Sequence, residues 1–269
     1  MKISTADEFS ERRELERLPL STLRWRLLRR VDRFVAVNAL AAEEFAASGI
    51  PASRIIHIPN GVPLSAEAAF DHAVKRAAKA RLGLQWRHIV IFVGRLSSEK
   101  NLSTVIEAWP QILRRHPEAH LLLVGDGGTF RSVEPDLRRQ ASAAGLEGCV
   151  HFIGRVADVQ DYLLAADVFV LPSSTEGMSN ALLEAMAAGV AVVATRVPGN
   201  AALIRDVDEG LLVERADVNG LAAAITRLLE SPEEATRLAQ AARRAVVERF
   251  AIQRVRDEYV SLYRSLIER

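Results

Sequence analysis

Pro172 to Thr195 has the sequence P-S-S-T-E-G-M-S-N-A-L-L-E-A-M-A-A-G-V-A-V-V-A-T, and this stretch decides the fold. An apolar run, Asp167 to Leu171, comes directly before it. The stretch then begins with a polar loop, Ser173 to Asn180, and continues as a helical segment and a second apolar run, Val190 to Ala194. Strand, loop, helix and strand make a βαβ unit. Uninterrupted apolar strands are typical of a parallel sheet that is covered on both faces.

The polar loop of this unit is a candidate ligand site. In doubly wound sheets, ligands bind beyond the carboxyl ends of the strands, where this loop lies. The loop also leads into a helix N-terminus, whose free N–H groups and dipole attract phosphate. Glu176 lies in the loop and Glu184 lies about one turn into the helix, whereas Leu182, Leu183 and Met186 supply the core. For the pair alone, the favoured interpretation is two surface glutamates of an ordinary βαβ unit.

A second loop of the same kind carries two cations. Arg87 to Val93 predicts a strand, and G-R-L-S-S-E-K-N follows it from Gly94 before a helix to about Arg115. Gly94 allows the backbone to approach a ligand closely. Arg95 offers a planar fork for oxyanions and Lys100 a mobile point charge, which together suit a diphosphate. Either cation alone would be interpreted as a solvated surface residue, and Glu99 is expected to pair locally or to cap the helix.

The rest of this half alternates strands and helices. Further strands are predicted at Ala119–Val124, Gly148–Ile153 and Gly210–Val213. The predicted helices are Ala68–Leu84, Thr129–Ala144, Asp158–Ala166, Asn219–Glu230, Pro232–Phe250 and Ile252–Ile267. Gly125-Asp126-Gly127-Gly128 suggests a dinucleotide fingerprint, but Phe130 stands where that motif needs its third glycine, so a turn is the better interpretation.

The N-terminal region is shorter. Residues 1–18 are charged and are expected to be frayed or helical, and Leu20 to Val31 predicts an amphipathic, arginine-rich helix. One interpretation of this helix is attachment to an anionic membrane surface; the favoured one is a solvated helix packed on a sheet. A strand at Arg33–Val37, a helix at Ala39–Ser48 and a strand at Arg54–Ile58 follow, and Pro59 to Pro63 forms a turn and linker.

The order of the motifs in this chain resembles that of the retaining glycosyltransferases of family 4. The motifs are V-G-R-L-x-x-E-K-N, V-G-D-G and E-x7-E with E-A-M-A-x-G, and the resemblance runs from about Asp32 to the C-terminus. The resemblance implies an α/β fold of GT-B type: a Rossmann-like, doubly wound parallel sheet with helices on both faces, plus a partial first Rossmann-like domain. It implies a remnant of the N-terminal acceptor domain and hinge at residues 1–62, a nucleotide-sugar-binding domain at 63–250 and a crossover helix at 251–269.

The resemblance also implies an activity, the transfer of a sugar from a nucleotide-diphosphate sugar to an acceptor with retention, by front-face attack. It implies catalytic roles for Arg95, Lys100 and Glu176, with Glu176 on the donor sugar and Glu184 on the ribose. The implied donor-binding residues are Gly94, Gly154, Val156, Gly177, Met178, Ser179, Asn180 and Glu184. Departures from the family pattern fall at Met178, Ser179 and Asn180, at Ala202 where a Glu is usual, and at Pro63 where an Asp is usual.

Composition limits the partners. The net charge of +1 gives no bulk attraction to nucleic acid. The single cysteine, Cys149, cannot form an internal disulfide, which fits a reducing cytoplasm. No apolar run approaches the ~18 residues of a membrane span, and the N-terminus lacks the apolar core of a signal peptide. We therefore expect a cytoplasmic chain, with peripheral contact at the inner face of the membrane as the alternative.

No cofactor is expected, because the six histidines are scattered along the sequence and no metal cluster is apparent in it. The donor would be a UDP-, GDP- or ADP-sugar, bound without a metal ion.

The short first domain leaves alternatives open. Two strands and two helices cannot bury both faces of a parallel sheet, so a partner chain is expected to supply the rest, or the chain is truncated. The chain would then be part of a truncated or split enzyme that transfers a sugar to a polysaccharide, a glycolipid or a small molecule. The alternatives are a nucleotide-sugar-binding module that is inactive alone and a GT-B nucleotide-sugar epimerase. The phosphate-loop spacing and E-x7-E favour the transferase over the epimerase.

Overall fold

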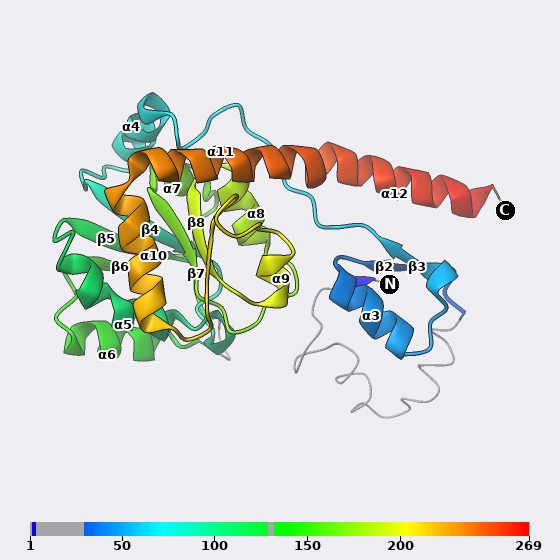
Figure 1. The fold of residues 1–269 in the computed structure, drawn as a ribbon, viewed down its shortest axis with the longest axis horizontal. Coiled ribbons are helices and arrows are strands. Elements are labelled where there is room, and N and C mark those ends of the chain that lie inside the picture. Colours follow the sequence, from blue (N-terminus) through cyan, green and yellow to red (C-terminus); the bar gives the residue numbers. More distant parts are fainter. Residues whose placement is uncertain (1, 4–29, 129–131, 269) are drawn as a thin grey trace.

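The computed structural model describes residues 2–3, 30–128 and 132–268, which form two parallel sheets with their helices (Figure 1). The arginine-rich helix expected from Leu20 falls outside the described residues as far as Arg29. At Lys2–Ile3, where a frayed or helical segment was expected, the chain forms a short strand, β1. That prediction was wrong because so short a strand is defined by its partner rather than by its own sequence pattern.

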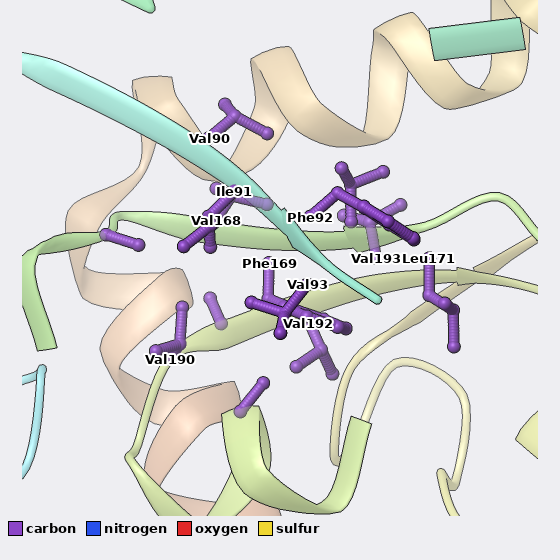
Figure 2. Close-up of a cluster of buried hydrophobic side chains, with 14 of the residues drawn as sticks. Val90, Ile91, Phe92, Val93, Val168, Phe169, Leu171, Val190, Val192 and Val193 are labelled. Carbon is purple, nitrogen blue, oxygen red and sulfur yellow. The ribbon is translucent and has the colours of Figure 1, made fainter. Parts of the chain in front are cut away.

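The larger sheet has six parallel strands in the order β6-β5-β4-β7-β8-β9. They are β4 (His88–Val93), β5 (Ala119–Val124), β6 (Val150–Gly154), β7 (Val168–Leu171), β8 (Ala191–Thr195) and β9 (Leu211–Val213). Side chains of β4, β7 and β8 pack together in a continuous apolar core (Figure 2). The chain builds outward from β4 to β6 and then returns to place β7 beside β4, so the strand order reverses between β4 and β7. Ligands bind at such a reversal in doubly wound sheets.

Helices cover both faces of this sheet (Figure 1). They are α4 (His72–Arg81), α5 (Leu102–Leu113), α6 (Glu134–Ala143), α7 (Gln160–Ala165), α8 (Asn180–Ala187), α9 (Pro198–Ala201), α10 (Val218–Glu230) and α11 (Pro232–Arg249). On one face α5 packs against α6 and α10; on the other α7 packs against α4 and α8 against α11. Helix α4 begins later than predicted because Asp71 caps it, accepting hydrogen bonds from the N–H groups of Ala73 and Val74.

The smaller sheet has the order β1-β2-β3, with β2 at Phe34–Ala36 and β3 at Ile55–His57. Because successive strand side chains point to opposite faces, β2 has two partners. Phe34 packs edge-on against Phe45 of α3 (Ala39–Ala47), whereas Val35 lies in a cluster with Val255 and Leu262 of α12 (Ile252–Ile267). Helix α12 thus covers the face of the smaller sheet that α3 leaves open, for which the neighbouring sequence offered no partner.

The linker between the two sheets is fixed to the larger unit. Val62 donates its N–H to the carbonyl of Phe250, and its own carbonyl accepts from Ile252, so the linker pairs with the junction of α11 and α12. From α11, the guanidinium of Arg243 donates to the carbonyls of Ser65, Glu67 and Ala187. Burial lowers the pKa of Arg243, and these carbonyls replace the water that its guanidinium loses.

Candidate functional site

The loops that follow β4 and β7 meet at the point where the strand order reverses. The carbonyl of Glu99 in the first loop accepts two hydrogen bonds from Ser174 in the second, from its N–H at 2.8 Å and from its Oγ at 3.1 Å. The carboxyl ends of two central strands are thereby joined into a single surface. The structure thus brings the two loops that the sequence singled out into direct contact.

An ion pair lies across this junction. Lys100 Nζ is 2.6 Å from Glu176 Oε1, and the Ser173 hydroxyl donates to the same oxygen at 2.7 Å. The side chain of Glu176 is only 8% exposed and that of Lys100 17%. Lys100 is held at the end of a 3-10 turn, Ser98–Lys100, by the left-handed residue Asn101 (φ 49°). The pair therefore sits in a low-dielectric environment in which each charge depends on the other.

Arg95 lies at the rim of the same surface, with its side chain 74% exposed. Its Nη2 is 3.2 Å from Glu99 Oε1, so the expected local pairing of Glu99 is confirmed. The pKa of Glu99 is lowered: burial acts to raise it, but the nearby Ser97 hydroxyl, the backbone N–H groups and Arg95 outweigh that effect. Arg95 can turn toward an anion on this surface because its only described ion pair is exposed and weak.

The loops that follow β5 and β6 continue the surface across the sheet. Gly94 N–H donates to Val124, and Gly125 N–H donates to Gly154, at 3.0 and 2.8 Å. A Cβ on Gly125, whose φ is 132°, would lie 1.9 Å from the Gly94 carbonyl oxygen. Gly125 is therefore required where two backbones touch. Gly94, predicted for close approach to a ligand, also makes this backbone contact.

The loop after β8 packs against the backbone of the loop that contains Glu176. A Cβ on Gly199 would lie 2.2 Å from the Glu176 carbonyl oxygen and 2.6 Å from that of Gly177. Thr195 Oγ1 donates to the Ser173 carbonyl at 2.5 Å. Sequence reasoning missed both supporting residues; the only signal in this loop was the departure from the family pattern at Ala202.

The N-terminus of α8 is occupied mainly by local contacts. The buried hydroxyl of Ser179 caps the helix by accepting from the Leu182 N–H at 3.3 Å. Its side chain is therefore committed to structure, and only its backbone could serve a ligand. Gly177, Met178 and Asn180 also lie in this segment, so the structure places all four predicted residues together at the end of β7.

The smaller sheet reaches the same segment. Asn38 Nδ2 donates to the Gly177 carbonyl at 2.5 Å, while Asn38 Oδ1 caps α3. Asn60 donates from Nδ2 to Asn180 Oδ1 at 2.8 Å and from its backbone to the Met178 sulfur at 3.2 Å. Neither asparagine was predicted as a site residue, although both stand at loop positions directly after strand-like segments.

Glu184 lies apart from the ion pair. It is half-buried, and burial raises the pKa of its carboxyl. It lines a cavity of about 160 Å³ together with the linker residues Val62, Pro63 and Ser65. The segment from Asp158 to Gln160, at the start of α7 and shortly after Val156, lines the same cavity. Gly154 adopts a φ of 76° at the end of β6, before that segment. The structure thus places Glu184 near the β6 loop rather than beside Glu176.

Four of the six histidines, which are scattered along the sequence, lie in two groups in three dimensions. His120 and His151 lie 2.9 Å apart (Nδ1 to Nε2), and the Trp86 ring stacks on both. His88, His116 and Glu118 bring ligand atoms within 4.8 Å of one another. Strand pairing brings these residues together although they are far apart in sequence. In the part of the chain that the structure describes, no helix is long and apolar enough to cross a bilayer.

The chain matches two family models. Residues 87–231 match the model described as glycosyl transferases group 1, and residues 6–66 match that of glycosyltransferase family 4. The first match covers more than half of the chain and contains the loops after β4, β7 and β8.

Among curated proteins, the lipopolysaccharide core biosynthesis glycosyltransferase LpsE of Rhizobium meliloti is 35% identical over 177 residues, or 66% of this chain and 50% of LpsE. The alpha-D-kanosaminyltransferase of Streptomyces kanamyceticus is 28% identical over 219 residues, or 81% of this chain and 56% of that protein. The chain thus spans about half the length of the curated relatives it matches.

Solved structures show the same fold. Anabaena Alr3699/HepE in complex with UDP-glucose superimposes with a TM-score of 0.84 at 22% identity, over 98% of this chain and 71% of HepE. Sucrose-phosphate synthase from Thermosynechococcus elongatus gives a TM-score of 0.80 at 28% identity, over 98% of this chain and 64% of that protein. The predicted α/β fold of GT-B type is confirmed.

Proposed function

The chain belongs to the group 1 glycosyl transferases, and from that premise we propose that its site transfers a sugar from a nucleotide-diphosphate donor to an acceptor with retention of configuration. The observation that carries the proposal is the Lys100–Glu176 ion pair, which lies at the reversal point of the sheet. An ordinary βαβ unit has no need for a nearly buried glutamate paired with a lysine at the ligand end of two strands.

The arrangement suits the departure of a nucleoside diphosphate. Negative charge develops on the diphosphate as the bond to the sugar breaks, and fixed positive groups stabilise it. Lys100, the exposed Arg95 and the N-terminus of α8 are the groups that we assign to this role. Glu176, oriented by Ser173 and Lys100, would contact the donor sugar. With two cations and a helix dipole present, we propose that the donor is bound without a metal ion.

We assign the nucleoside to the other side of α8. Glu184 lines a cavity next to the segment that follows β6, so its carboxylate could accept hydrogen bonds from the ribose hydroxyls while Gly154 and Val156 border the base. HepE was crystallised with UDP-glucose, which supports a nucleotide-sugar donor without fixing the base. The relatives named above act on different sugars and acceptors, so neither the sugar nor the acceptor is assigned. The acceptor would approach from the side of Asn38 and Asn60.

Titration with nucleoside diphosphates tests the donor site. The full chain, treated with EDTA, is titrated calorimetrically with UDP, GDP and ADP. One of them is expected to bind, and Arg95→Ala should weaken it by roughly tenfold or more, since a charge-assisted hydrogen bond is lost. Arg139→Ala is the matched control, because Arg139 is equally exposed (73%) and pairs with a carboxylate on its own helix. A folded chain that binds none of the three would refute the proposed site.

A Glu184→Gln substitution tests the assignment of the ribose. A raised pKa in the folded state means that the native chain binds the proton more tightly, so stability falls as pH rises from the ordinary pKa of Glu through the raised one. At pH 7, the Glu184→Gln variant should therefore unfold at the same temperature as the unmodified chain or higher. Nucleotide affinity should nevertheless fall roughly tenfold, because a charged acceptor is lost. Glu233→Gln, at an exposed position of α11, is the control; equal affinities in both variants would exclude the ribose role.

A further inference from the structure

We infer that His88, His116 and Glu118 form a binding site for one divalent transition-metal ion of the zinc type. The site lies at the amino ends of β4 and β5, whereas the donor loops lie at the carboxyl ends of the strands. The inference is independent of the proposed function. Its residues start or precede strands, whereas the donor loops follow them. β4 has six residues of about 3.3 Å each, so the amino and carboxyl ends of this strand are about 20 Å apart.

The spacing of the three side chains matches tetrahedral coordination. His88 begins β4 and is in register with Ala119 of β5, which places it beside Glu118. His88 Nε2 and Glu118 Oε1 are 3.4 Å apart, and ligand atoms of all three residues lie within 4.8 Å. Metal–ligand bonds of about 2.0–2.1 Å hold tetrahedral neighbours about 3.3 Å apart. His88 and Glu118 thus already have the required separation, and the two distances from His116 to them are at most 4.8 Å.

The third ligand has a nitrogen that needs a partner. His116 is 9% exposed, and its Nε2 is buried without a hydrogen-bond partner among the residues that the structure describes. A buried polar atom left unpaired costs free energy, so it is rare without a reason. A metal ion bound between His116 and Glu118 would satisfy this nitrogen. The imidazole rings of His88 and His116 are close, with centroids 5.1 Å apart.

The backbone holds this site in place before any ion binds. His116 N–H donates to the Ile112 carbonyl at 2.9 Å, and the His116 carbonyl accepts from Ala119 at 3.0 Å. Pro117 restricts the turn between the two ligands. The ion would thus tie the end of α5 to the start of β4 and β5, which gives it a stabilising role in the domain.

The surrounding charges permit a cation. Arg87 Nε lies 3.8 Å from Glu118 Oε1, but its side chain is 76% exposed, so it can move away. The nearby Asp167 carboxylate is paired with Lys75 at 2.7 Å.

The test is a titration of the EDTA-treated full chain with Zn²⁺, and with Co²⁺ followed by its visible absorption. We expect one ion per chain and a tetrahedral Co²⁺ spectrum. At 100 times the dissociation constant, Zn²⁺ should raise the unfolding temperature by about 5 °C or more. His116→Ala should weaken binding by about 100-fold, since even outer-shell changes cost 10–100-fold. Glu118→Ala, at a partly exposed position that tolerates truncation, should also weaken binding strongly.

Two controls separate this site from other histidines. His57→Ala removes an exposed histidine outside both groups and should leave binding unchanged. His151→Ala removes one member of the second pair, whose facing nitrogens already contact each other, and should also leave it unchanged. Zn²⁺ affinity that is unaltered in folded His116→Ala and Glu118→Ala, or lost in His151→Ala instead, overturns the inference. Absence of stoichiometric binding to the unmodified chain does the same.

Discussion

Lys100→Met is expected to lower the free energy of unfolding by about 3 kcal/mol and the affinity for a nucleoside diphosphate by about 100-fold or more. The stability loss arises because the carboxylate of Glu176, only 8% exposed, would lose the cation that pairs with it. The affinity loss has a separate cause, because the lysine is also the proposed cation for the diphosphate. Urea unfolding measures the first effect and calorimetric titration the second.

A second ion pair of the same sheet provides the control. Lys75 and Asp167 are 2.7 Å apart, and the Lys75 side chain is 19% exposed, close to the 17% of Lys100. Lys75→Met should therefore reduce stability while leaving nucleotide affinity unchanged. The double variant Lys100→Met/Glu176→Gln should recover much of the stability, because no charge is then left unpaired, but should not recover affinity. Affinity that survives in folded Lys100→Met would remove this lysine from the donor site.

Gly125→Ala should destabilise the chain by about 3 kcal/mol or more and disrupt nucleotide binding. An L-residue at φ 132° is strained, which costs about 1–3 kcal/mol, and its Cβ would meet the Gly94 carbonyl oxygen at 1.9 Å. Because that atom is backbone, the loops after β4 and β5 would have to separate. The expected fall in unfolding temperature is about 6–12 °C, at 2–4 °C per kcal/mol.

Gly148→Ala is the matched control for this backbone contact. Nothing lies within 4 Å of a Cβ at Gly148, and its φ is not positive, so the change should be close to neutral. Circular dichroism melts of both variants, with the nucleotide titration repeated on each, give the comparison. Equal melting temperatures would mean that the two loops are not packed as described.

The large sheet could be predicted because its strands carry their own signal. Runs such as Arg87–Val93 and Ala119–Val124 are mostly apolar and are separated by helical segments, which leaves a parallel α/β sheet as the consistent solution. The GT-B fold implied by the resemblance is confirmed, and the ends of most elements lie within a few residues of their predicted positions. Strand β1 and the four-residue helix α9 were missed, because both are shorter than any period that a sequence pattern can show.

The candidate site was predictable only in part. Lys100 and Glu176 were singled out from their own loops, but their contact bridges 76 positions of sequence. Asn38, Asn60 and Gly199 were missed for the same reason: each matters through an atom far away in sequence, and an asparagine or glycine in a loop has many local explanations. The grouping of His88 and His116 likewise follows from strand register, which no local pattern reveals.

The hydrogen bonds from Asn38 and Asn60 to residues 177–180 have a thermodynamic consequence. The segment at the start of α8 serves two partners: one set of its atoms faces the proposed donor and another holds the smaller sheet. If a donor changes the free energy of that segment, the position of the smaller sheet must change the donor's affinity by the same factor, because linkage is reciprocal. Ligand occupancy and the docking of the two sheets would then be two readouts of one equilibrium.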